Sequence, residues 1–373
     1  MRFHFYFLLP ALLFCVSSQA QDLKYCGATE KQQQMFVNNP ALVIQEDQFR
    51  QFIHNWMEIH QSQTREETIY VIPIVFHIIH DYGSENISDD QVRDAVRILN
   101  EDFRKMNADT SDIVDAFKNV AGDSKIEFRL ANKAPDGSCT NGIEHIHSLH
   151  TYSGDDDAKL SDWPRSEYLN IWTTKTLDNG IAGYAYFPSG APSDVDGVIV
   201  LSNYVGSVGS STSFTSRVVT HEIGHSFGLA HTWGFTNAPG VECGDDLIDD
   251  TPETEGWVSC NLNGNICHPG TIENVQNYME YAYCSRMFTK DQGLAMQGTL
   301  NSNTSDRNNL WTLNNLIATG TDDTIKTLCP PKADFYATAK MACLGGEITF
   351  RDVSTNGTVS NRTWTFQDGS PST

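Results

Sequence analysis

The chain has 373 residues, of which 39% are hydrophobic and 10% aromatic, so it can build a folded core and is not a disordered protein. It carries 25 Lys and Arg against 47 Asp and Glu, and this net charge of −22 repels phosphate backbones, which excludes non-specific nucleic-acid binding. The length allows two or three domains. Such acidity indicates either solubility outside the cell or acids that bind calcium.

The N-terminal residues have the pattern of a secretory signal peptide. Arg2 supplies a positive charge, residues 3–16 are almost wholly apolar but too few to span a bilayer, and residues 17–20 offer a small-residue cleavage site. We therefore expect residues 1–20 to be removed and the mature chain to be secreted without a membrane span. One of the nine cysteines, Cys15, leaves with this segment, and the others are expected to form disulfides in an oxidising compartment.

The next elements alternate between helix and strand. Residues 21–65 are polar and mostly helical in pattern, with apolar residues at helical spacing in 45–59. Ser88, followed three positions later by Gln91, predicts the start of a helix through Phe103. Strands are expected at 68–79, 125–130, 168–174, 183–187 and 197–201, and further helices at 217–228 and 290–300. This alternation predicts a mixed α/β domain.

Residues 237–275 are rich in turn-forming residues and hold three cysteines, Cys243, Cys260 and Cys267. A segment of this length is too long to be structureless in a compact domain. We expect disulfides or a bound ion to hold it.

Residues 221–231 carry the chemistry. His221 and His225 are four positions apart, so on a helix they share one face and can reach the same metal ion. Gly228 can end the helix in the left-handed conformation, and the chain then delivers His231 as a third ligand. Three imidazoles with one open position are typical of a catalytic zinc. Glu222 lies beside the first ligand and is placed to act as the general base and acid of peptide hydrolysis.

With these motifs the chain resembles a metzincin zinc metallopeptidase of the pappalysin family, in its cytophagalysin-like bacterial branch. The resemblance runs from about residue 69 to 320, and the matching pieces are residues 221–234, 243–246, 249–252, 277–281, 284–289 and 308–311. It implies an α/β (α+β) catalytic domain with a twisted mixed sheet, an active-site helix and an irregular, disulfide-held C-terminal subdomain.

The resemblance also implies roles for individual residues. Residues 277–281 would form a methionine turn below the metal, in which Met279 is the floor beneath the zinc and Tyr281 hydrogen-bonds the oxyanion. The expected disulfides are Cys243–Cys267 and Cys260–Cys284. Substrate would lie extended and antiparallel along the strand at 183–187. Relatives hold calcium in the disulfide-held loop after the third histidine, for which the possible ligands here are Asp245, Asp246, Asp249, Asp250 and Thr251.

Cys26 is a candidate for a thiolate that blocks the zinc in a precursor, as pro-segments of this family can do. The alternative is a disulfide from Cys26 to Cys139 or Cys329. If Cys139 and Cys329 pair with each other instead, Cys26 is left free, and Cys343 lies in another domain. We expect a propeptide over residues 21–66, with the activating cut within 61–67, for example after Arg65.

The C-terminal residues from 333 onward have the pattern of short strands. Short strands are expected at 333–335, 346–354 and 361–369, and residues 363–369 resemble the start of a PKD-type β-sandwich. We expect residues 67–331 to form the catalytic domain and residues 332–373 an incomplete PKD-like sandwich of a longer parent.

The leading hypothesis is a secreted zinc endopeptidase, made as a zymogen, that acts on protein or peptide substrates. The alternatives are a catalytically silent binding or adhesion protein on the same scaffold, and a zinc amidase that acts on non-protein substrates. Several relatives prefer a basic residue just after the cleaved bond, which pairs with an acid between the methionine turn and the next cysteine. Ala282 and Tyr283 stand there in this chain, so we expect a broader or more apolar preference. The sequence leaves the oligomeric state open.

Overall fold

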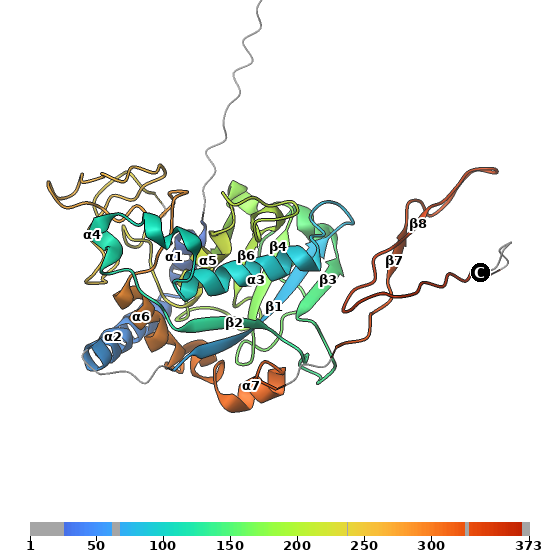
Figure 1. Ribbon diagram of the computed structural model, residues 1–373, viewed down its shortest axis with the longest axis horizontal. Coiled ribbons are helices and arrows are strands. Elements are labelled where there is room, and N and C mark those ends of the chain that lie inside the picture. The colour runs from blue at the N-terminus through green and yellow to red at the C-terminus, as the bar shows by residue number, and fades with distance from the viewer. Residues whose placement is uncertain (1–25, 62–67, 237, 325–327, 368–373) are drawn as a thin grey trace, which may run out of the picture.

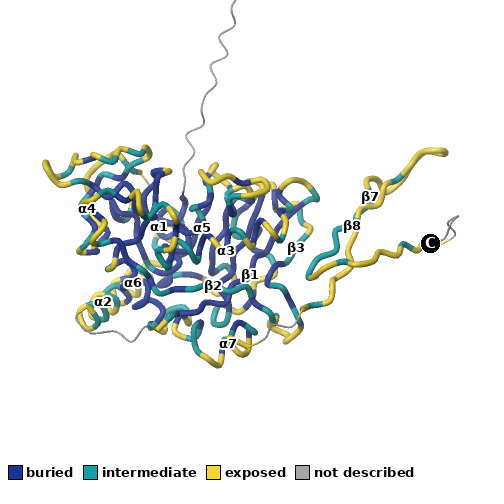
Figure 2. The backbone as a smooth tube through the Cα atoms, viewed as in Figure 1, coloured by how far each residue is buried: buried dark blue, intermediate teal, exposed yellow. Residues whose placement is uncertain are grey.

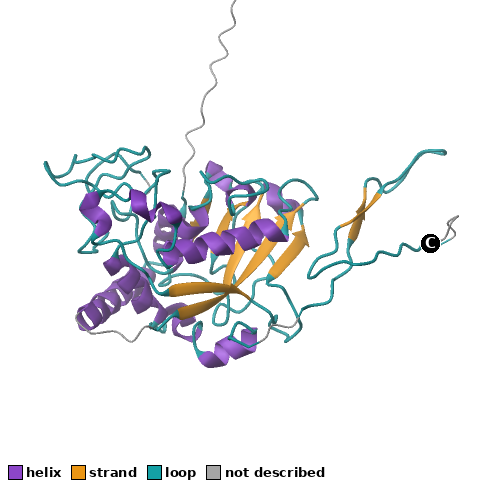
Figure 3. Ribbon diagram, viewed as in Figure 1, coloured by secondary structure: helices purple, strands orange, loops and turns teal. Residues whose placement is uncertain are grey.

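The computed structural model describes residues 26–61, 68–236, 238–324 and 328–367 (Figure 1). The expected signal peptide and residues 62–67 of the expected activation segment lie outside these ranges. Figure 3 shows a mixed sheet with helices around it and a small strand pair that stands apart.

Two helices precede the sheet, α1 (Ala28–Asn38) and α2 (Ala41–Gln61). The helix predicted over 45–59 is therefore confirmed as the larger part of α2. This helix lies beside α6 (Lys290–Leu300) and buries Phe49, while most of its other face is exposed (Figure 2).

The main sheet has the order β2-β1-β4-β6-β5, with β3 paired to the second half of β1. All pairs are parallel except β5 with β6, so β5 is an antiparallel edge strand. The strands are β1 (Tyr70–His80), β2 (Ile126–Leu130), β3 (Ile143–His147), β4 (Leu169–Thr174), β5 (Gly183–Ala185) and β6 (Val198–Leu201). Five of the six were predicted, within three residues at each end, and β3 was not.

β1 is buried along its whole length, as expected for a central strand covered on both faces. Ile72, Ile74 and Phe76 contribute to the main core together with the apolar sides of α3 (Asp89–Phe103) and α5 (Val218–Ser226). Val75 and Ile79, with the opposite orientation, pack in two smaller clusters. α5 thus packs against β5 and β6 of the sheet and against α3.

Two predicted helix starts are confirmed by their caps. The hydroxyl of Ser88 accepts the backbone N–H of Gln91 and begins α3. The Gln91 side chain does not complete a capping box, since it donates to the carbonyls of Ser202 and Val205 instead. Thr289 and Gln292 do form a full capping box at α6, a device that stabilises a helix by about 1 kcal/mol.

The remaining described helices are short. They are α4 (Asp115–Lys118), α7 (Leu313–Thr319) and 3-10 segments at Ala108–Asp112, Leu149–Tyr152, Asp156–Ala158, Asp178–Gly180, Ser202–Tyr204 and Thr304–Asn309. No described helix is long and apolar enough to cross a membrane.

The segment after α5 forms no named helix or strand in its described residues, and disulfides hold it as predicted. Cys243 pairs with Cys267 and Cys260 with Cys284, which confirms the interleaved pattern. Each bridge spans 24 positions, and closing a loop of that size stabilises the fold by about 3 kcal/mol in the chain-entropy account.

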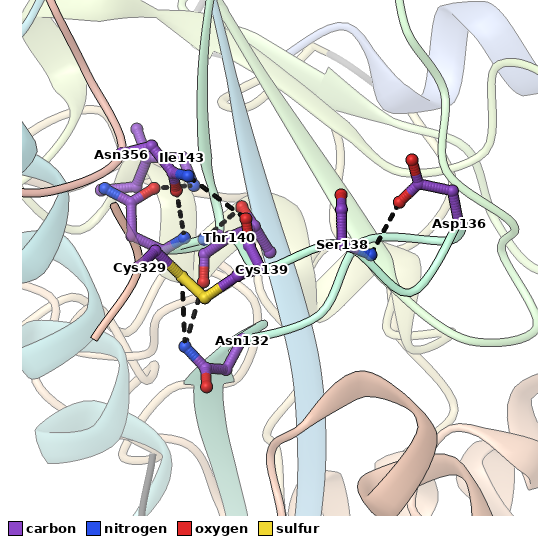
Figure 4. The surroundings of a disulfide bond; sticks show 10 residues. Asn132, Asp136, Ser138, Cys139, Thr140, Ile143, Cys329 and Asn356 are labelled. Carbon is purple, nitrogen blue, oxygen red and sulfur yellow. Dashed lines mark hydrogen bonds between the residues drawn. A yellow bond between two sulfur atoms is a disulfide. The ribbon is translucent and has the colours of Figure 1, made fainter. Parts of the chain in front are cut away.

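A third disulfide, Cys139–Cys329, ties the C-terminal segment to the β2–β3 connection (Figure 4). Asn356 reinforces this junction, because its side chain accepts the N–H of Asn141 and donates to the carbonyl of Cys139. Cys26 and Cys343 are free. The alternative disulfide from Cys26 to Cys139 or Cys329 is therefore ruled out.

The C-terminal segment contains the antiparallel pair β7 (Phe335–Ala337) and β8 (Phe350–Asp352). This pair stands on the opposite side of the molecule from α2 (Figure 1). The third strand predicted at 361–369 is not formed in residues 361–367, although Trp364 and Phe366 lie against the ring of Phe350. Because a two-stranded pair buries little apolar surface, several of these aromatic side chains stay exposed.

Candidate metal centre

Three histidine side chains converge at the end of α5. The Nε2 atom of His225 lies 3.1 Å from Nε2 of His221 and 3.2 Å from Nε2 of His231. His225 and His231 are fully buried, and His221 is 7% exposed. The sequence predicted this cluster from its spacing alone.

The other nitrogen of each ring fixes its direction. Each Nδ1 lies 2.7–3.2 Å from a backbone carbonyl, those of Tyr278, Leu229 and Thr236 in turn. A carbonyl can only accept, so each Nδ1 carries the hydrogen and each Nε2 points a lone pair at the others. Burial lowers the pKa of His221 to about 4 and holds the pKa of His225 and of His231 well below the usual range. Three neutral imidazole lone pairs aimed at one point repel each other without a cation, and they are a donor set that fits zinc.

Two glycines let the chain adopt this geometry. Gly228 has φ +89°, a left-handed conformation that ends α5 and turns the chain toward His231. Gly224 faces the methionine turn, where an added Cβ would lie 2.4 Å from Sδ of Met279. Met279 is fully buried directly against the helix that carries two of the histidines, in agreement with its predicted place as the floor.

Glu222 is the buried carboxyl of the site. It lies on α5 directly after His221, and its Oε2 is 3.5 Å from Sγ of Cys26. Burial raises the pKa of this carboxyl well above its usual range. A carboxyl whose pKa is raised in this way binds a proton more readily than an exposed one, which suits a group that takes up a proton and returns it.

Tyr281 reaches the same centre from the methionine turn. Its hydroxyl donates to the backbone carbonyl of Cys26 at 3.4 Å, and its ring lies edge-on to His231 and to Trp233. Sequence reasoning placed this tyrosine near the metal, and the structure does bring it there.

Cys26 completes the cluster. Its Sγ and the ligand nitrogens of the three histidines lie within 4.8 Å of one another, the one group with metal-ligand spacing among the described residues. The next residue, Gly27, donates its N–H to the carbonyl of Gly183 at 3.0 Å, and Cys26 pairs with Gly183 in the parallel sense. Burial, together with the Glu222 carboxyl, raises the pKa of the Cys26 thiol.

A second layer of contacts, which sequence reasoning missed, centres on Asp102 of α3. Its carboxylate accepts from Thr220 Oγ1 at 2.8 Å and from Tyr278 OH at 2.7 Å, and Nε of Arg217 lies 3.2 Å away. Tyr278 also provides the carbonyl that orients His221. A signal was present, because Asp102 lies on the apolar side of an amphipathic helix where an acid is unexpected.

The five possible calcium ligands lie in one loop, but the four carboxylates among them have separate roles. Asp246 is buried and accepts from the backbone N–H of Ile248 and the hydroxyl of Thr251. Asp250 accepts the N–H of Asp291 at 3.1 Å, near the start of α6. Asp245 accepts the N–H of Leu247, and Asp249 is exposed. Within the described residues these acids do not form a group with metal-ligand spacing.

Comparison with known proteins agrees with this geometry. Residues 152–301 match the pregnancy-associated plasma protein-A peptidase family. A mutant of promirolysin from Tannerella forsythia has 31% sequence identity and a TM-score of 0.68, and the match covers 77% of this chain and 97% of that one. The chain belongs to the pappalysin family. It is a metalloendopeptidase that acts on protein or peptide substrates, and its fold is the expected metzincin fold.

Other pappalysin relatives extend this comparison. Mature mirolysin from T. forsythia in complex with a cleaved peptide has 33% identity and a TM-score of 0.61, and covers 68% of this chain and 99% of its own. Extracellular metalloproteases of Arthroderma benhamiae and Coccidioides posadasii are 25% and 28% identical to this pappalysin, over 60% and 59% of its chain and 69% and 73% of theirs.

Proposed function

We propose that the metal of this pappalysin is zinc, bound by His221, His225 and His231, with Glu222 as the general base and acid. The observation that carries this proposal is the convergence of three buried Nε2 atoms whose Nδ1 partners are all carbonyls. Neutral nitrogen ligands with a free position are what a catalytic zinc requires.

The residues around the ligands have complementary tasks. Bound zinc lowers the pKa of a water ligand and polarises the substrate carbonyl. Glu222 takes a proton from the attacking water and returns it to the leaving amine, which its raised pKa favours. The hydroxyl of Tyr281 donates a hydrogen bond to the oxyanion that develops on the carbonyl.

We also propose that the chain is made as a zymogen with the propeptide at residues 21–66. Three features support this: the position of Cys26 Sγ beside the ligand nitrogens, the parallel pairing of Cys26 with the β5 edge, and the larger share of the chain matched by promirolysin than by mature mirolysin. Cys26 would bind the zinc as a thiolate until a cut near Arg65 releases the segment, and the parallel pairing is opposite in sense to the antiparallel course proposed for substrate.

The remaining boundaries are proposals of the same kind. Residues 1–20 would be a signal peptide, 67–331 the catalytic domain and 332–373 a PKD-like segment. Secretion is supported by three disulfides and by relatives that are named extracellular. Calcium binding by the loop at 245–251 stays a prediction of the resemblance. It would appear as a rise in melting temperature on adding calcium to a zinc-saturated protein.

The deciding experiment compares casein hydrolysis by the propeptide-free protein before and after zinc removal, and then by Glu222→Ala. We expect activity to vanish with the metal and return with added zinc. Glu222→Ala should retain one zinc by metal analysis but lose activity by about 10²–10⁴-fold. Retained activity in this variant contradicts the role of Glu222. Zinc binding without hydrolysis of any peptide would favour the silent scaffold or the amidase.

A further inference from the structure

A pocket opens beside Glu222 and Tyr281 on the side of the methionine turn. The residues that define its character come from the segment before α5, from α5 itself and from residues 278–283 around the methionine turn. They are Phe214, Arg217, Val218, Tyr278, Ala282 and Tyr283. Since the pocket also touches His221, a side chain next to the cleaved bond can enter it.

The walls of this pocket are mainly apolar. Phe214 and Tyr283 stack at a centroid distance of 5.0 Å, and both are more than half exposed, so their rings form an accessible rim. Ala282 and Tyr278 are buried. An aromatic rim above apolar walls favours an uncharged side chain.

The one cationic group of the described lining, Arg217, is already neutralised by residues behind the pocket. Its terminal nitrogens donate to Asp109 at 3.1 and 3.3 Å and to the carbonyl of Ser285 at 2.6 Å. Its Nε lies 3.2 Å from Asp102. Because these partners already occupy the guanidinium, an acidic substrate side chain gains little from it.

No carboxylate of the described lining is available to a basic side chain either. Apart from the catalytic Glu222, the one carboxylate of the described lining is that of Glu280, the residue after Met279. Glu280 is buried, and its two oxygens accept from the hydroxyl of Thr232 at 2.6 Å and the N–H of Trp257 at 2.7 Å. A lysine or arginine entering the pocket would meet Arg217 without a free acid, which is an unfavourable burial of charge.

We propose that this pocket receives the substrate residue directly after the cleaved bond and selects an uncharged aliphatic or aromatic side chain there. The inference rests on the proposed peptidase function and names its substrate class. The pocket disfavours a charged substrate side chain of either sign. Arg217 is paired with Asp102 and Asp109, so the wall offers neither a free cation nor a free carboxylate.

The test uses peptides that differ only in the residue after the cleaved bond: Leu, Phe, Arg, Lys or Glu. With the propeptide-free enzyme, we expect kcat/KM for Leu and Phe to exceed that for the three charged residues by about tenfold or more. Arg or Lys peptides cleaved as fast as the Leu peptide would overturn the inference.

A variant at the rim makes the test sharper. Tyr283→Asp adds a carboxylate at the pocket mouth and should raise kcat/KM for the Arg peptide while lowering it for the Leu peptide. Tyr283→Asn introduces a side chain of the same size as Asp but without its charge. It should lower kcat/KM for the Leu peptide without raising kcat/KM for the Arg peptide. A gain for Arg in both variants, or in neither, contradicts the electrostatic argument.

A binding measurement separates this inference from the peptidase function. The dissociation constants of the same peptides are measured on propeptide-free, zinc-loaded Glu222→Ala. If that variant binds the Leu peptide more tightly than the Arg peptide while the wild type cleaves none, the pocket assignment stands and the peptidase function fails. Equal dissociation constants with normal cleavage overturn the pocket assignment alone.

Discussion

The Sγ atom of Cys26 lies 3.5 Å from Oε2 of Glu222, although 196 positions separate the two residues in the chain. A buried contact of this kind places an N-terminal residue directly on the proposed general base. The same residue bridges to Gly183 on the β5 edge, so the base and the substrate edge are covered together.

The first prediction follows from this contact. Cys26→Ala removes the sulfur but leaves α1 and α2 in place, and we expect the uncut precursor to cleave a fluorogenic peptide about tenfold faster or more than the wild-type precursor. Cys343→Ala is the matched control, because it removes the other free cysteine, which is exposed and lies in the C-terminal segment. A Cys26→Ala precursor that stays as latent as this control argues against the thiol switch.

The second prediction concerns the β5 edge. Ala182 accepts the N–H of Leu201, so by alternation Tyr184 pairs with β6 while the N–H groups of Gly183 and Ala185 face away from it. Ala185→Pro removes an outward N–H, which in this structure also hydrogen-bonds the Glu222 carboxyl. The loss of a substrate hydrogen bond worth about 1 kcal/mol should by itself lower kcat/KM about fivefold. Steady-state kinetics on a peptide substrate measures this change in kcat/KM.

Tyr184→Pro is the contrasting variant. It removes an N–H that points into the sheet, so its main effect should be a lower melting temperature. If Ala185→Pro folds normally and its kcat/KM is unchanged, substrate does not use this edge. If Ala185→Pro fails to fold, peptides N-methylated at single amides give the same information with the wild-type enzyme.

The third prediction uses the buried acid behind the ligands. Burial raises the pKa of Asp102 to about 6 from its usual 3.8, against the attraction of Arg217. The folded state therefore binds the proton more tightly than the unfolded state, and this residue's contribution to stability falls as pH rises from about 4 to about 6. Asp102→Asn lacks the effect, so its stability relative to wild type should increase over that window by up to about 3 kcal/mol.

Urea unfolding at pH 4.5 and 7.5 measures this difference. Glu101→Gln is the control, since it removes a more exposed carboxylate from the same helix. A stability difference between Asp102→Asn and wild type that does not change with pH would show that Asp102 does not titrate in this range. A reduced zinc affinity of Asp102→Asn would further indicate that it positions His221 through Tyr278.

Local patterns predicted most of the fold. The apolar run of β1, the cap at Ser88 and the helix at 290–300 depend on neighbours in sequence, and each was found where expected. β3 was missed because three of its five residues are Glu144, His145 and His147, which do not look like a strand. Their polar groups form hydrogen bonds with residues that are far away in the sequence, such as Asp89 for His145. These partners cannot be identified from the local pattern.

The same distinction holds in the metal centre. The ligands and Glu222 lie within the eleven residues 221–231, in α5 and the turn that follows it, so their spacing alone predicted them. Asp102 and Arg217 act across α3, α5 and the methionine turn, and their pairing exists only once these elements pack together. The position of the Glu280 carboxylate likewise depends on Thr232 and Trp257, which lie 48 and 23 positions away.

The Cys139–Cys329 bridge has a consequence for a protein exposed to proteolysis, including its own. A cut in the connection between Gly320 and Leu328 would break the backbone, yet the catalytic part and the C-terminal segment would still travel as one covalent molecule. The nicked form would show its two fragments only after reduction, so an intact band on a non-reducing gel does not prove an intact chain.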